Sequence, residues 1–159
     1  MKLFDKSLLD ELAAKAAASP RLRTNYNIHA SPTDPVQRFL VAANAGTYFR
    51  PHRHLTKSEL AIALRGRFDV VTFDESGTVL ARYSVGDETP GIGYETPRAT
   101  WHTVISCVDG STFLEIKEGP YDAATAAEFA PWSPPEGDAA VPRFLDWVRA
   151  AQPGSAFPG

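Results

Sequence analysis

The sequence has little of three things that would point to common classes of protein: cysteine, long apolar runs and excess positive charge. Cys107 is the one cysteine among 159 residues, which excludes an intrachain disulfide and argues against a zinc site built from thiolates. No run approaches the ~18 apolar residues of a membrane span. The N-terminal residues also lack the apolar stretch of a signal peptide. We therefore expect a cytoplasmic protein with no membrane contact.

The charge balance argues against a nucleic-acid partner. Lys and Arg number 16 and Asp and Glu 19, giving a formal net charge of −3, whereas nucleic-acid binders usually present a net basic face. Hydrophobic residues make up 43% and charged residues 22%, an ordinary globular composition. The length suits one domain over residues 1–159 with one core, and a small molecule is the expected ligand.

Short β-like segments dominate the middle of the chain. The apolar stripe of residues 6–18 predicts one helix there, with Ser7 as its N-cap and Pro20 marking its end. After Pro20, turn residues separate runs rich in β-branched and aromatic side chains, which is typical of a sandwich or barrel. The predicted strands are 25–29, 36–42, 46–53, 58–64, 67–74, 78–84, 100–107 and 111–117.

The chain changes character again after residue 118. We expect a barrel over about 25–118 and a C-terminal extension over 119–159. Within the extension, 122–129 is predicted to form a short helix and 131–137, with three prolines, an extended segment. The apolar residues of 141–150 fit a last short helix, and 152–159 is expected to be disordered.

Three histidines and one glutamate at close spacing indicate a metal site. One residue separates His52 from His54, so in an extended strand both side chains project from the same face. Glu59 follows after room for a turn, and His102 comes from a later strand that begins after a Gly- and Pro-containing turn. Three imidazoles and a carboxylate suit one divalent transition metal: Fe, Mn, Ni, Co or Zn. Such a set leaves coordination positions for water or substrate, as where a metal does chemistry.

These stretches resemble the paired motifs of the cupin superfamily. The first motif matches without a gap at Gly46, His52, His54, Glu59 and Gly66. The second matches at Gly91, Pro97 and His102, with Ala99 in place of a glycine and Ser106 in place of an asparagine. The resemblance implies a mainly β cupin fold, a double-stranded β-helix or jelly-roll barrel, with an N-terminal helix and short C-terminal helices. It implies that His52, His54, Glu59 and His102 are the metal ligands, and also a homodimer, since cupins often pair.

A narrower resemblance links residues 2–138 to the WbuC-type cupin-fold metalloproteins. It rests on five segments: 19–29, 35–38, 50–54, 119–122 and 129–134. Ser58 departs from that pattern, which has an aromatic residue before the glutamate. Members often lie in gene clusters for surface polysaccharide, so the resemblance hints at sugar metabolism without giving a substrate.

Several polar residues are candidates for the pocket around the metal. Asn25, Asn27 and His29 alternate along a predicted strand, which indicates either a substrate-binding face or a solvated edge strand. Arg50 and Tyr48 share the parity of His52, which points them into the same cavity. Arg50 would hold an anionic group or pair with Glu115, and Arg38 has the same two interpretations. Tyr48 and His29 are candidates for moving a proton, although Tyr48 also fits simple barrel filling.

Three functions remain open from the sequence. The favoured one is a metal-dependent enzyme acting on a small polar or anionic substrate, with a sugar derivative as the specific guess. The second is a binding or sensing module without turnover. The third is a metal-free barrel resembling sugar-nucleotide epimerases, against which the complete metal motif argues.

Overall fold

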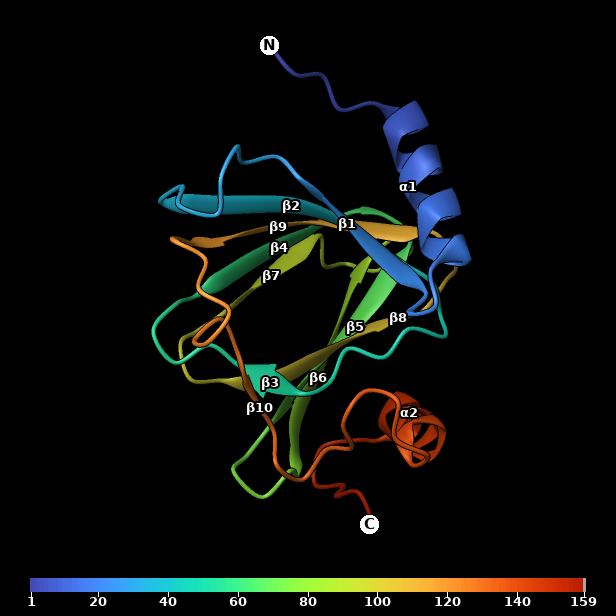
Figure 1. Ribbon diagram of the computed structural model, residues 1–159. Coiled ribbons are helices and arrows are strands. Elements are labelled where there is room, and N and C mark those ends of the chain that lie inside the picture. The colour runs from blue at the N-terminus through green and yellow to red at the C-terminus, as the bar shows by residue number, and fades with distance from the viewer. Residues whose placement is uncertain (159) are drawn as a thin grey trace.

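The computed structural model describes residues 1–158 and consists of two facing five-stranded sheets with one helix on each outer side (Figure 1). Helix α1 spans Lys6–Ala18 and helix α2 spans Val141–Ala150. The strands are β1 (Arg23–Asn27), β2 (Val36–Ala43), β3 (His52–Arg53), β4 (Glu59–Arg65), β5 (Arg67–Phe73), β6 (Val79–Gly86), β7 (Gly93–Thr96), β8 (Trp101–Ser106), β9 (Ser111–Glu118) and β10 (Glu128–Phe129). No helix within residues 1–158 is long and apolar enough to span a bilayer.

The sheets interleave distant segments, as a jelly-roll barrel requires. The first sheet has the order β1-β2-β9-β4-β7 and the second the order β10-β3-β8-β5-β6, and the strands within each pair antiparallel. The sequence-adjacent strands β4 and β5 therefore lie in different sheets. Residues far apart along the chain, such as His52 and His102, become direct neighbours across a strand pair.

Three apolar clusters hold the layers together. The cluster between the sheets contains Val41, Phe68, Val104 and Phe113, contributed by both sheets. Helix α1 buries Leu12 and Ala16 against the outer side of the first sheet. Helix α2 buries Phe144 and Val148 against the outer side of the second sheet, where Trp101 points away from its neighbour His102 as the strand alternation predicts.

Several predicted elements differ from the structure, each for a physical reason. Asp5, and not Ser7, caps α1, since its carboxylate accepts the Leu8 N–H at 3.1 Å. The predicted strand 46–53 shrinks to β3, because Pro51 has no N–H to donate to a ladder. The predicted helix 122–129 is wrong: this segment forms turns and then β10, which pairs with β3. The Gly-rich stretch that reads as a turn contains strand β7.

The end of the chain packs on the protein, so the predicted disorder of 152–159 is wrong for residues up to 158. Gly154 N–H donates to Val79 O at 2.8 Å, and Val79 N–H donates to Ser155 O at 2.8 Å. Phe157 lies 5.0 Å from the Phe144 ring and 5.4 Å from the Trp147 ring, measured between centroids. Aromatic burial thus orders a segment that is polar and Gly/Pro-rich in sequence. Gly159 lies outside the described residues.

Candidate metal centre

The four predicted ligands converge at one end of the barrel, between the two sheets. His52 lies on β3 directly opposite His102 on β8, whereas Glu59 begins β4 in the other sheet. One ligand atom from each of His52, His54, Glu59 and His102 lies within 4.8 Å of the others, a group that can hold a metal ion. Arg53 points the opposite way, stacking on Trp101 at 4.2 Å, so the alternation predicted for His52 and His54 holds.

Backbone carbonyls orient all three imidazole rings. Nδ1 of His52 donates to Arg50 O at 2.9 Å, Nδ1 of His54 to Ala126 O at 2.6 Å, and Nδ1 of His102 to Thr100 O at 2.9 Å. A ring that donates from Nδ1 presents the lone pair of Nε2, which is how a second hydrogen bond prepares a histidine for a metal. The Nε2 atom of His102 is buried and has no hydrogen-bond partner within residues 1–158.

The protonation states of His52, His102 and Glu59 match what a metal ion requires. Burial, reinforced by neighbouring His102, lowers the pKa of His52 to about 3, and burial also lowers the pKa of His102. Burial alone would raise the pKa of Glu59, but the hydrogen bond from His54 and the charges of His102 and Lys117 bring it below its usual range. The neutral imidazoles of His52 and His102 and the ionised carboxylate of Glu59 are the forms that bind divalent transition metals.

A buried acid–base pair beside the cluster was not predicted from the sequence. Lys117 Nζ lies 2.6 Å from Glu115 Oε1 and 3.6 Å from Glu59 Oε2. Both side chains come from β9, whose register places Lys117 opposite Glu59 and Glu115 opposite Ala61. Burial and the charge of Glu59 raise the pKa of Glu115 to about 7. The sequence did contain a sign of this pair. Phe113 is a core residue, and Glu115 and Lys117 follow it at two-residue steps on β9, so all three side chains point inward.

A basic recess opens in front of the cluster. Its volume is about 180 Å³, and it reaches His52 and His54. The cationic side chains that line it are Arg21, Arg23, Arg50 and Lys117, against one anionic side chain, Glu136. The excess of positive charge makes this recess suited to an anionic group.

Arg50 lies in this recess, as predicted, although residue 50 is not part of a strand, and its partner is the C-terminal extension and not Glu115. Its Nε donates to Ser133 Oγ at 3.1 Å, and one terminal nitrogen donates to Ala130 O at 3.1 Å and Ser133 O at 3.2 Å. The other terminal nitrogen makes no hydrogen bond to the part of the chain that the structure describes. Arg50 therefore holds the extension in place and keeps N–H groups for a ligand.

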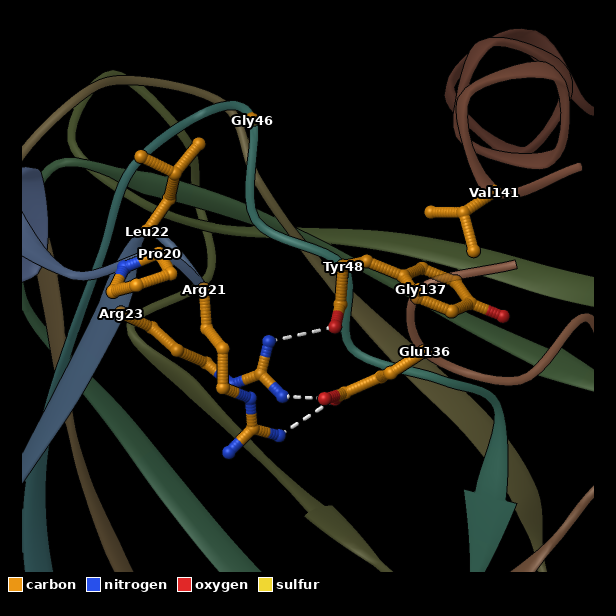
Figure 2. A pocket seen from close by; sticks show the side chains of 9 residues that line it. All are labelled: Pro20, Arg21, Leu22, Arg23, Gly46, Tyr48, Glu136, Gly137 and Val141. Carbon is orange, nitrogen blue, oxygen red and sulfur yellow. Dashed lines mark hydrogen bonds and ion pairs between the residues drawn. The ribbon is translucent and has the colours of Figure 1, made fainter. Parts of the chain in front are cut away.

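Tyr48 does not point toward the cluster, which corrects its predicted place in the metal cavity. Residues 46–51 are not a strand, so the parity argument fails there. The phenol packs edge-on against Phe144 at 5.8 Å, its hydroxyl donates to Pro134 O at 2.9 Å, and burial raises its pKa to about 12. Figure 2 shows Tyr48 beside a second recess of about 320 Å³, where Arg21 and Arg23 meet Glu136. Tyr48 is thus core packing here.

The other predicted pocket residues separate into two places. Asn25, Asn27 and His29 line a recess of their own, which does not include the four cluster residues. Arg38 lies exposed on the outer side of β2, since it shares the parity of Leu40 beneath α1. The expectation that Arg38 faces the cavity is therefore wrong.

Ala99, which stands where the cupin motif has glycine, adopts the left-handed backbone conformation with φ of 59°. Its N–H donates to His54 O at 2.8 Å, so this turn connects the loops of two cluster histidines. The motif therefore keeps its geometry despite the substitution, at some conformational cost.

Comparison with known proteins gives one family match and several structures of similar fold. A family model described as "Domain of unknown function (DUF6016)" matches residues 4–85. No curated protein matches the sequence. Among solved structures, oxalate oxidase in complex with the substrate analogue glycolate has a TM-score of 0.53 at 15% identity, covering 84% of this chain and 68% of that one.

This chain also resembles parts of two longer chains of known structure. DMSP lyase DddQ from Ruegeria pomeroyi has a TM-score of 0.53 at 20% identity and covers 73% of this chain. The capsular polysaccharide assembling protein CapF from Staphylococcus aureus has a TM-score of 0.51 at 16% identity and covers 61%. This chain spans 54% of DddQ and 27% of CapF. These likenesses confirm the predicted cupin fold.

Proposed function

The chain belongs to the DUF6016 family, a domain of unknown function, and from its site we propose that it is a metal-dependent enzyme acting on a small anionic substrate. The observation that carries the proposal is the set of three carbonyl-oriented histidines facing one buried carboxylate. We propose that His52, His54, Glu59 and His102 are the ligands of one divalent transition metal. A bound ion of this kind would polarise a carbonyl or activate water or dioxygen.

The chain's own side chains support an anionic substrate. The recess in front of the cluster carries four cations and one anion, and the free N–H groups of Arg50 can donate to a carboxylate or phosphate. Lys117 holds its proton beside Glu59, because the charges of Glu115 and Glu59 raise its pKa although burial alone would lower it. Lys117 can therefore donate a hydrogen bond to a ligand atom at the cluster.

The comparisons support the same substrate class. Oxalate oxidase was solved with glycolate, a small carboxylate, on the same fold. The finer proposal is a sugar derivative in surface polysaccharide metabolism, at which the resemblance to WbuC-type proteins hints, and the likeness to a capsular polysaccharide assembling protein supports it.

Elemental analysis of protein purified without added metal tests the first part. We expect about one equivalent of a transition metal in wild type and its loss in the His52→Ala/His102→Ala variant. The matched control is His29→Ala, because His29 is the one histidine outside the cluster. Wild type that binds no Fe, Mn, Ni or Zn even after reconstitution would overturn the proposal.

Ligand binding tests the second part with a matched pair of variants. Arg21 lines the recess and Arg98 does not, and their side chains are about equally exposed, at 60% and 63%. Arg21→Gln should weaken binding of small carboxylates such as glycolate, whereas Arg98→Gln should not. Equal effects of the two substitutions would mean that the recess does not bind the anion. Binding without any turnover would leave a sensing module as the function.

A further inference from the structure

The recess lined by Asn25, Asn27 and His29 lies at the edge strand of the first sheet, on the inner side of β1 and β2. Its volume is about 330 Å³. The residues used below are Asn25, Asn27, His29, Gln37, Phe39 and Tyr121. Within residues 1–158, no Asp, Glu, Lys or Arg lines this recess, in contrast to the basic recess at the cluster. An anionic ligand would find no counter-charge here, so the recess suits a neutral ligand.

The two asparagines offer both kinds of hydrogen-bonding group. Asn25 Nδ2 donates to Asn27 Oδ1 at 2.7 Å, and this bond fixes the orientation of both amides. Asn25 Oδ1 remains an acceptor and Asn27 Nδ2 remains a donor. Both side chains are exposed, which leaves them accessible to a ligand.

His29 and Gln37 add a ring nitrogen and a second amide acceptor deeper in the recess. His29 Nδ1 lies 2.9 Å from Arg38 O and 3.0 Å from Arg38 N, so the backbone of Arg38 engages Nδ1 and Nε2 is left for a ligand. Gln37 Nε2 donates to Asp34 O at 2.8 Å and to Pro32 O at 3.2 Å, so its amide orientation is fixed too. Gln37 is 1% exposed, and its Oε1 has no partner within the described chain. A buried acceptor without a donor costs free energy that a ligand hydroxyl can recover.

Two aromatic side chains complete the lining, and the loop around them is fixed in place. Tyr121 N–H donates to Pro32 O at 2.7 Å and Gly119 N–H donates to Pro35 O at 2.8 Å, which ties the segment carrying Tyr121 to the loop before β2. Phe39 packs edge-on against His29 at 5.1 Å. The recess is therefore preformed, which lowers the entropy cost of binding.

We propose that this recess binds a neutral, hydroxyl-rich ring, that is, a monosaccharide unit. A sugar hydroxyl both donates and accepts hydrogen bonds, which suits a recess that offers both kinds of group: Asn25 Oδ1, Asn27 Nδ2, His29 Nε2 and Gln37 Oε1. The C–H face of the sugar ring can lie on an aromatic side chain. The recess adjoins the metal centre through one side chain, since Lys117 Nζ lies 5.3 Å from the Phe39 ring centroid. That the ring belongs to the enzyme's substrate rests on the proposed function, whereas binding in the recess does not.

NMR titration of ¹⁵N-labelled wild-type protein tests the proposal, because the side-chain NH₂ groups of Asn25 and Asn27 give their own signals. The probes are D-glucose, D-galactose and N-acetyl-D-glucosamine, with D-glucuronate as the charged counterpart of glucose. We expect saturable shifts of these signals with at least one neutral sugar. Asn27→Ala should weaken that binding about fivefold, the loss of one hydrogen bond of about 1 kcal/mol. Gln152→Ala, which removes an amide outside the recess, should leave it unchanged.

Three results would overturn the proposal: no saturable shift with any of the three neutral sugars, equal binding by wild type and both Asn25→Ala and Asn27→Ala, or binding of glucuronate alone. The same titration on His52→Ala/His102→Ala protein separates this proposal from the metal-dependent function. Sugar binding that persists there supports the recess whatever becomes of the metal site. Sugar binding that disappears there, with the fold retained, would assign the shifts to the metal centre and refute the separate site.

Discussion

His54 Nε2 lies 2.9 Å from Glu59 Oε2, although the other nitrogen of the same ring already donates its proton to Ala126 O. If His54 is neutral, two lone pairs face each other inside the protein, which is repulsive unless a cation lies between them. The cation can be a proton on His54 or a metal ion. The short contact between these two side chains therefore favours a bound cation at this position.

Removing the metal should lower the melting temperature. A ligand present at about 1,000 times its Kd stabilises the native state by about 4 kcal/mol. For a chain of this length that corresponds to a shift of roughly 8–16 °C. Calorimetry of wild type before and after chelation measures the shift, and His52→Ala/His102→Ala protein should show none. An unchanged wild-type transition after verified metal removal would contradict a stabilising metal site.

The metal-free protein should become more stable as the pH rises from about 3 to 6.5. Burial lowers the pKa of His52 from 6.5 to about 3, so between these values the unfolded chain binds a proton that the native chain does not. Stability then increases with pH at up to about 1.4 kcal/mol per unit for this residue. Urea unfolding across this range measures the slope for wild type and His52→Gln. The variant should have the smaller slope, and equal slopes would show that His52 is not held neutral by burial.

Lys117→Met should destabilise the protein by about 3 kcal/mol, because it leaves the buried carboxylates of Glu115 and Glu59 without their shared cation. The double variant Lys117→Met/Glu115→Gln should recover part of the loss, since one of the two uncompensated charges is gone. Denaturant unfolding of wild type, Lys117→Met, Glu115→Gln and the double variant gives the coupling free energy between the two side chains. Additive effects would mean that Lys117 and Glu115 do not interact.

Ala99→Gly should stabilise the protein by about 0.5–1 kcal/mol. The left-handed conformation costs an L-residue about 1–2 kcal/mol, from which the larger backbone entropy of glycine subtracts about 0.5–1 kcal/mol. Ala99 is exposed, so no packing is lost. The control is Ala123→Gly, an exposed turn residue without positive φ, which should not stabilise. The prediction fails if both substitutions have the same effect on the unfolding midpoint.

Three of the four cluster residues were predictable because they lie close together in the sequence. His52 is on β3, His54 follows β3 directly and Glu59 begins β4, and period-two alternation from His52 to His54 fixes the common side of the two histidines. His102 lies on the distant strand β8 and was assigned through its match to the second cupin motif. The prediction failed for Tyr48 because it extended the same alternation over residues 46–51, where no ladder exists. For Asn25, Asn27 and His29 the alternation was right, but the sequence does not say which strands separate them from the metal.

The unpredicted parts depend on contacts between distant segments. Lys117 lies beside Glu59 only because β9 pairs with β4. The sequence around neither residue predicts that these two strands pair. Likewise, the carbonyl that orients His54 belongs to Ala126, in a segment that reads as a helix in sequence but forms turns beside β3. Tertiary pairing overrides local propensity in such segments.

The hydrogen bond from His54 to Ala126 also has a consequence for how the site is assembled on the ribosome. All four donor side chains are synthesised by residue 102, whereas the carbonyl that sets the His54 ring arrives 24 residues later, with the segment that Arg50 then fastens. A nascent chain therefore possesses all four donor side chains before it possesses the carbonyl that orients His54. In the finished protein, a metal ion held by the proposed ligands would therefore depend on residues 126–133 for the orientation of one of those ligands.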